Sequence, residues 1–172
     1  MPALELPSTD GSVRRVDVVP AGSERFIIYA YPMTGVPGVE LPSGWDDIPG
    51  ARGCTPETCG FRDHAAELSD LGAAVAGVAT QSTSYQQEVV SRLGLPFPLL
   101  SDASLALTTA LRLPTFDIET GPLHDGAGAK TLLRRLTLVV RDGRIEKVFY
   151  PVFPPDAHAD DVLAWLAGNP AK

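Results

Sequence analysis

The sequence lacks most of the features that would place it in a specialised class of protein. It has only two cysteines and three lysines among 172 residues, and its formal net charge is −7. A basic face is needed to displace counterions from nucleic acid, so this charge argues against a nucleic-acid partner. No run approaches the roughly 18 apolar residues that cross a bilayer, and Met1–Val13 has neither the basic cluster nor the apolar core of a signal peptide. We therefore expect a cytoplasmic protein with no membrane partner.

The rest of the composition is that of one folded domain. Hydrophobic residues make up 44% of the chain and charged residues 20%, which excludes wholesale disorder. No repeat of solenoid length and no low-complexity tract interrupts the chain. The length is sufficient to bury a core without disulfide or metal support. We predict a single domain over residues 1–172.

Apolar runs that alternate with amphipathic patterns predict an α/β fold. The predicted strands are Val13–Val19, Phe26–Tyr31, Ala74–Thr80, Phe97–Leu100, Leu132–Val140 and Arg144–Tyr150, the last two joined by a hairpin at Asp142-Gly143. The predicted helices run from a Thr55 cap to Gly72, from a Ser84/Gln87 capping box to Gly94, from an Asp102 cap to Leu111, and from Asp156 to Leu166. This order predicts a thioredoxin-like fold, with a mixed central sheet, helices on both faces and an N-terminal strand extension.

Two segments are predicted to be loops. Pro32–Gly53 contains too many prolines and glycines for regular structure, and its Trp45 and Ile48 predict that it packs against the domain. Leu123–Lys130 is rich in glycine and alanine. The first loop leads directly into the two cysteines.

Cys54 and Cys59 are the most informative residues of the sequence. Cys54 lies at the start of a predicted helix, where free N–H groups and the helix dipole favour a thiolate, and Arg52 adds positive charge nearby. The plain alternative is a small buried cysteine without reactivity. An ideal helix separates the two Cα atoms by roughly 8 to 9 Å, beyond the limit of about 7 Å for a disulfide. A Cys54–Cys59 disulfide would therefore require the first helical turns to unwind.

Metal and cofactor sites have little support in the sequence. A zinc site would need two further ligands, and the three histidines, His64, His124 and His158, are scattered along the chain. No phosphate-binding glycine motif and no G-x-G-x-x-G is present. We expect neither a metal nor an organic cofactor.

Arg134 and Arg135 interrupt the apolar run Leu132–Val140. Strand alternation would place them on opposite faces. An inward guanidinium needs an anionic partner, for which a thiolate would serve, because an unpaired buried charge is costly. The alternative, that both lie in water at a frayed strand end, stays open.

The segment Gly53–Asp63, with the sequence GCTPETCGFRD, closely resembles the active-site segment of peroxiredoxins of the bacterioferritin-comigratory (Q) type, in the alkyl hydroperoxide reductase/thiol-specific antioxidant superfamily. Leu99–Asp102 (LLSD) and Arg135–Gly143 (RLTLVVRDG) are similar to later landmarks of that family. The resemblance covers nearly the whole chain.

This resemblance implies roles for individual residues. Cys54 matches the peroxidatic cysteine, Cys59 the resolving cysteine, and Arg135 the arginine that holds the thiolate and the peroxide. Pro32 resembles the proline that shields the pocket.

One position departs from the family pattern. Three residues before the reactive cysteine the family has Thr or Ser, whereas this chain has Ala51. We expect either that Thr34 supplies the missing hydroxyl through space or that Arg52 replaces it electrostatically.

The implied function is a thiol-dependent peroxidase. It would reduce hydrogen peroxide or an organic hydroperoxide through a Cys54 sulfenic acid and a Cys54–Cys59 disulfide, which a thioredoxin-like reductant reopens. Two alternatives stay open: a protein thiol-disulfide oxidoreductase, which would not need Arg135, and a peroxide sensor that does not turn over. The sequence is compatible with a monomer or a homodimer.

Overall fold

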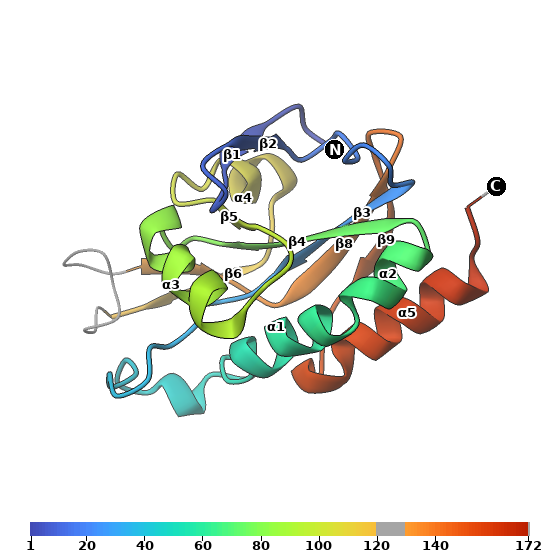
Figure 1. The fold of residues 1–172 in the computed structure, drawn as a ribbon. Coiled ribbons are helices and arrows are strands. Elements are labelled where there is room, and N and C mark those ends of the chain that lie inside the picture. Colours follow the sequence, from blue (N-terminus) through green and yellow to red (C-terminus); the bar gives the residue numbers. More distant parts are fainter. Residues whose placement is uncertain (120–129, 172) are drawn as a thin grey trace.

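A five-stranded mixed sheet is the centre of the fold (Figure 1). The computed structural model describes residues 1–119 and 130–171. Across the sheet the strand order is β5 (Leu99–Ser101), β4 (Ala73–Ala79), β3 (Arg25–Ala30), β8 (Leu136–Arg141) and β9 (Arg144–Phe149). The first three strands are mutually parallel, while β8 runs antiparallel to both β3 and β9. The predicted mixed central sheet is confirmed.

Alternation along the buried strand β3 divides the interior into two cores. The helices are α1 (Cys54–Asp63), α2 (Ala65–Asp70), α3 (Thr83–Leu93), α4 (Ala106–Leu111) and α5 (His158–Gly168). Ile27 and Tyr29 belong to the core beneath α1, α2, α3 and α5. Phe26 and Ile28 belong to the opposite core, which α4 and the strand pair β1 (Glu5–Pro7) and β2 (Val13–Arg15) cover. The predicted coverage of both faces and the N-terminal strand extension are thus confirmed.

The predicted strand Leu132–Val140 is wrong as one element. It is divided into β7 (Lys130–Leu133) and β8, and β7 pairs with β6 (Thr115–Ile118), a strand that the sequence did not predict. The division occurs at Arg134 and Arg135, because the side chain of Arg135 turns into the interior rather than following the ladder. The hairpin at Asp142-Gly143 is confirmed, and both residues have positive φ angles.

Other boundaries also differ from prediction. The helix expected to run as far as Gly72 is broken at His64, whose backbone (φ −97°, ψ 10°) is not helical. Ser82, rather than Ser84, caps α3 by accepting a hydrogen bond from the N–H of Tyr85, although α3 does end at Gly94. The strand expected over Val13–Val19 is only the three residues of β2. The last helix begins with the 3-10 turn η2 (Pro155–Ala157).

The loop Pro32–Gly53 packs against the domain, as predicted. It contains the 3-10 turn η1 (Trp45–Asp47), and Trp45 is only 3% exposed. Trp45 forms a small core with Met33 and Ala51 of the loop and with Ile118 and Leu132 of the β6–β7 pair. The second predicted loop, Leu123–Lys130, lies outside the described residues except for Lys130, which begins β7.

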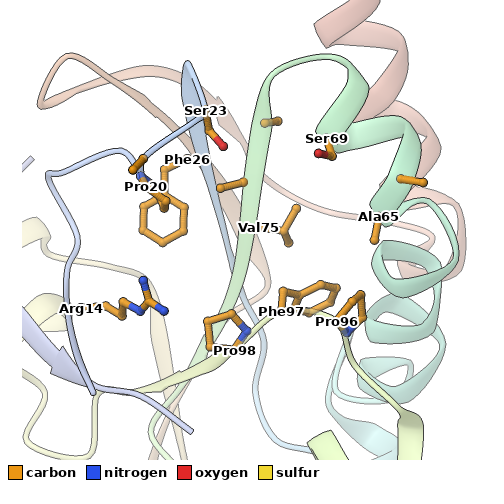
Figure 2. A pocket seen from close by; sticks show the side chains of 14 residues that line it. Arg14, Pro20, Ser23, Phe26, Ala65, Ser69, Val75, Pro96, Phe97 and Pro98 are labelled. Carbon is orange, nitrogen blue, oxygen red and sulfur yellow. The ribbon is translucent and has the colours of Figure 1, made fainter. Parts of the chain in front are cut away.

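Strand β5 is much shorter than its neighbour β4. It pairs only with Gly77, Val78 and Ala79, so the first half of β4 has no strand beside it on that edge. A cavity follows this uncovered edge, bordered by Pro96 and Pro98 (Figure 2).

The start of α1 depends on Gly53. Thr55 was predicted to cap this helix, but the cap is Gly53, whose φ of 104° is strained for any residue with a side chain. A Cβ atom at Gly53 would lie 2.3 Å from Cγ of Pro155 in η2. The helix therefore begins two residues earlier than predicted, in close contact with the C-terminal part of the chain.

A Gly53→Ala substitution should lower the free energy of unfolding by about 2 kcal/mol, because it combines backbone strain with this steric clash. Urea denaturation would measure the loss. Gly168→Ala is the matched control, since a Cβ there meets no atom within 4 Å, and it should change stability by less than about 1 kcal/mol. Equal stability of the two variants would contradict the role of Gly53.

Candidate active site

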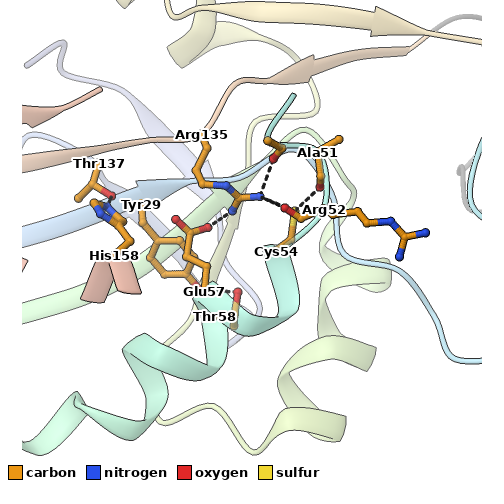
Figure 3. Close-up of polar contacts among 10 residues, drawn as sticks. Tyr29, Ala51, Arg52, Cys54, Glu57, Thr58, Arg135, Thr137 and His158 are labelled. Atoms are coloured by element: carbon orange, nitrogen blue, oxygen red, sulfur yellow. Dashed lines mark hydrogen bonds and ion pairs between the residues drawn. The ribbon is translucent and has the colours of Figure 1, made fainter. Parts of the chain in front are cut away.

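Cys54 is the first residue of α1 and is 4% exposed. Its Sγ lies 3.2 Å from Nη2 of Arg135, which donates to it, and 3.5 Å from the carbonyl oxygen of Ala51 (Figure 3). The sulfur therefore has a cationic donor on one side and a backbone acceptor on the other. A thiol can donate its proton to the carbonyl of Ala51, whereas a thiolate can accept the hydrogen bond from Arg135.

The inward position of Arg135 is confirmed, with the residue only 4% exposed. Besides Cys54, its Nη2 donates to the carbonyl oxygens of Gly50 at 3.0 Å and Arg52 at 3.5 Å, and its Nη1 donates to Oε2 of Glu57. Arg134 instead places its guanidinium 5.5 Å from the ring centre of Phe116. The two arginines therefore have different surroundings, and only Arg135 reaches the cysteine.

Glu57 is a member of the site whose contact with Arg135 the sequence did not reveal. Its side chain is fully buried, and Oε1 has no hydrogen-bond partner in the described part of the chain. Burial raises the pKa of this carboxyl to about 8, although the guanidinium of Arg135 opposes that increase. The sequence could have indicated Glu57 as a site residue, because it lies three residues after Cys54 and the two side chains therefore share one face of a helix.

Burial of the sulfur opposes the Cys54 thiolate that the helix start and a nearby positive charge were expected to favour. Burial raises the pKa of the Cys54 thiol, and the Arg135 guanidinium and the Met33 backbone offset only part of that increase. Glu57 adds to the rise, because its carboxylate repels a thiolate. The site is therefore built around a thiol whose ionised form depends on Arg135.

Arg52 does not act on Cys54 through its charge, contrary to expectation. Its guanidinium forms an exposed ion pair with Asp46, with Nε 2.5 Å from Oδ1 and Nη2 2.9 Å from Oδ2. Figure 3 shows this side chain directed away from the sulfur. Arg52 contributes its carbonyl oxygen to Arg135 instead.

Thr34 does not replace the hydroxyl that is missing at Ala51. It is buried, but its Oγ1 lies 3.4 Å from Oε1 of Gln81, to which its backbone N–H also donates. Ala51 is itself buried and serves the site through its carbonyl oxygen. The position therefore interacts with Cys54 through backbone rather than through a side-chain hydroxyl.

Two cavities flank Cys54 and Arg135. An open cavity of about 590 Å³ contains Cys54 and is bordered by loop residues that include Met33, Leu41 and Trp45. A smaller one, of about 170 Å³, is bordered by Pro32 and Arg135. Pro32 therefore lies next to the arginine, and not on the wall of the cavity that holds Cys54.

Cys59 lies in the same continuous helix as Cys54. It is partly exposed, and both cysteines are free thiols. The backbone between them is helical throughout, which is the arrangement that prevents a direct disulfide at this spacing.

His158 is buried behind this site, at the start of α5. It shares a 2.8 Å hydrogen bond between its Nε2 and Oγ1 of Thr137, and it packs edge-on against Phe61 and Phe149. Burial, together with the charge of Arg135, lowers the pKa of His158 to about 4. The imidazole is therefore neutral at physiological pH.

Within residues 1–119 and 130–171, no three His, Cys, Asp or Glu side chains come together in a group that could hold a metal ion. No helix in the same ranges is both long and apolar enough to span a bilayer.

Comparisons with known proteins place the whole chain in one group. The family model described as Redoxin matches residues 1–163. Peroxiredoxin Bcp of Escherichia coli K12 is 28% identical over 166 residues, which cover 96% of this chain and 91% of that protein. The extent of these matches agrees with the resemblance seen in Gly53–Asp63.

Solved structures give the same result for the fold. The crystal structure of peroxidoxin BcpB from Mycobacterium tuberculosis matches with a TM-score of 0.71 and 27% identity, covering 98% of this chain and 94% of that one. The bacterioferritin comigratory protein of Xanthomonas campestris, studied for alkyl peroxide reduction, matches with a TM-score of 0.72 at 23% identity, covering 98% and 92%. The predicted thioredoxin-like fold is thereby confirmed.

Replacing Glu57 by Gln should lower the pKa of Cys54, because the buried carboxylate that forms above about pH 8 would no longer repel the thiolate or compete for Arg135. The pH dependence of alkylation by iodoacetamide, measured in a Cys59→Ser background, would report the titration. Glu67→Gln, on the exposed face of α2, is the control. An unchanged or higher Cys54 pKa in the Glu57→Gln protein would contradict this coupling.

His158 should make the fold less stable in mild acid. Its pKa is about 4 in the folded chain against an ordinary value of 6.5, so the unfolded chain takes up the proton first as the pH falls. The contribution of the neutral imidazole to the free energy of unfolding is complete above pH 6.5. On the order of 3 kcal/mol of it is lost as the pH falls towards 4.

Urea unfolding at several pH values would measure this loss. A His158→Gln variant should lack this component of the pH dependence, whereas His64→Gln, at a partly exposed histidine, should retain it. An equal acid loss in the native and His158→Gln proteins would show that another group is responsible.

Proposed function

Because this chain belongs to the Redoxin family and is a peroxiredoxin of the bacterioferritin-comigratory type, we propose that Cys54 is the thiol that reduces the hydroperoxide and that Cys59 is its disulfide partner. The observation that carries this assignment is the 3.2 Å contact between Arg135 Nη2 and Cys54 Sγ. No other cysteine is present, and only Cys54 has a guanidinium in contact with its sulfur among the described residues.

The first step oxidises Cys54. Its thiolate attacks the terminal oxygen of the hydroperoxide, the O–O bond breaks, and the other oxygen leaves with the electron pair and takes a proton to become an alcohol or water. The sulfur loses two electrons and becomes a sulfenic acid. Arg135 holds a fixed positive charge beside the sulfur, where it stabilises first the thiolate and then the negative charge that develops on the departing oxygen.

Glu57 controls how much of that positive charge reaches the sulfur. Burial raises the pKa of its carboxyl, which favours the protonated form over the carboxylate. A neutral Glu57 keeps Arg135 in place through the hydrogen bond without cancelling its charge. The charge is then available to the thiolate and to the reacting oxygens.

The second step joins Cys54 to Cys59. The thiolate of Cys59 attacks the sulfenic sulfur, an S–S bond forms, and hydroxide leaves and is protonated to water. Because both cysteines lie in α1, the first turns of this helix must unwind before the sulfurs meet. We propose that a thioredoxin-like dithiol then reduces the disulfide and is itself oxidised.

The setting of the enzyme follows from this cycle. We propose a cytoplasmic location. The cycle uses a thioredoxin-like dithiol, and the two cysteines are free thiols, as in a reducing compartment. We also propose that residues 1–172 act as one domain, since both cysteines and Arg135 gather around the same sheet.

Cys54→Ser should abolish peroxide consumption, whereas Cys59→Ser should consume about one equivalent per chain and accumulate a sulfenic acid, which dimedone labels. Stopped-flow assays with hydrogen peroxide and cumene hydroperoxide, with and without a thioredoxin system, would measure both. Turnover by the Cys54→Ser protein would reject the proposal. Reduction of insulin disulfides by the native protein without peroxide turnover would instead indicate a thiol-disulfide oxidoreductase.

A further inference from the structure

The uncovered edge of β4 has backbone groups that no strand uses. The N–H of Tyr31 donates to the carbonyl of Val78, so Val78 faces β3, while the N–H of Gly77 donates to the carbonyl of Pro98, so Gly77 faces β5. Successive residues of a strand face opposite neighbours. Ala73 and Val75 therefore face the same side as Gly77, where β5 is absent. Within residues 1–119 and 130–171, neither has a backbone partner on that side.

The polypeptide before β5 is unable to close this edge. Pro96 and Pro98 have no N–H group to donate to β4, and Phe97 between them is buried in the core beneath α1 and α5. The chain consequently leaves the sheet at this point. The edge is open because the two prolines lack N–H groups and because the buried side chain of Phe97 turns the chain away from β4.

Walls on both faces of the sheet turn this edge into a slot, here called the β4 slot, of about 500 Å³. Figure 2 shows Ala65 and Ser69 of α2 on one side of the strand and Phe26 and Pro20 on the other. Its lining is mostly alanine, proline and phenylalanine.

Arg14 is the single charged residue among those that line the β4 slot in the described structure. Its guanidinium lies at one end of the slot, beneath Phe26 and close to Pro98 in Figure 2. Nη2 is held by Asp10, whereas the buried Nε has no partner in the described residues. A ligand that lies along the edge would therefore meet hydrogen-bonding backbone in the middle and, at one end, the free Nε donor of a guanidinium that is paired with Asp10.

We propose that the β4 slot binds an extended peptide that adds a strand to β4 and directs its C-terminal carboxylate towards Arg14. Main-chain hydrogen bonds from Ala73 and Val75 supply the pairing, and small or apolar side chains fit between α2 and Phe26. The carboxylate accepts a hydrogen bond from the unpartnered Nε of Arg14, beside the ion pair that Arg14 already forms with Asp10. This site is separate from Cys54, so the proposal does not depend on the peroxidase assignment.

Hydrogen exchange and NMR on the native chain test the edge directly. The amide protons of Ala73 and Val75 should exchange much faster than those of Ala74 and Ala76, which face β3. Addition of a pool of short synthetic peptides with free C-termini should slow exchange at Ala73 and Val75 only. Equally slow exchange of all four amides in the free protein would overturn the proposal.

Variants identify the site of binding. Ser69→Trp fills the β4 slot from an exposed position of α2 and should abolish peptide retention, whereas Asp70→Trp, which lies outside the slot, should not. Arg14→Gln, or amidation of the peptides, should weaken binding roughly tenfold.

Three further results would overturn the proposal. The first is retention of the peptides by the Ser69→Trp protein, and the second is equal affinity for the amidated peptides. The third is protection of the two amides without peptide. Protection by benzoate alone would show that the slot binds a small acid, and protection by dimerisation of the free protein would show that it binds a second copy of the chain.

Discussion

A single buried guanidinium organises the active site. Removing the charge of Arg135 from water is costly unless several groups compensate for it, and here the compensation comes from α1, through Glu57 and Cys54, and from the loop before it, through the carbonyls of Gly50 and Arg52. The loop has to be ordered for those carbonyls to be in place. Its order comes from the small core around Trp45, which joins the loop to the β6–β7 pair.

Arg135 is shared between two acids of different strength. Both Glu57 and Cys54 are buried, and burial raises the pKa of each. When one of them is ionised, the other loses much of its electrostatic support, so the pair favours one negative charge over two. The reactivity of the sulfur is therefore a property of the three side chains together and is not set by the helix terminus alone.

Much of the fold was predictable, because buried strands and punctuated helices leave a strong local pattern. The apolar run in β3 and the hairpin at Asp142-Gly143 are examples, and the helix signals of Thr55 and Pro56 placed Cys54 at the start of a helix. The inward turn of Arg135, the division of its strand and the burial of Glu57 depend on tertiary contacts that sequence spacing does not report. The same holds for Arg52 and Thr34, whose partners Asp46 and Gln81 are set by the path of the loop.

The contact between Gly53 and Pro155 links the chemistry of α1 to the shape of the C-terminal region. If α1 unwinds as proposed so that the sulfurs can join, the surface against η2 would be released, and the oxidised molecule would have a different outline from the reduced one. A reductase that recognises this outline would distinguish the oxidised enzyme from the reduced enzyme without contacting either sulfur. The reductant would then bind mainly the disulfide form and not be occupied by the reduced enzyme.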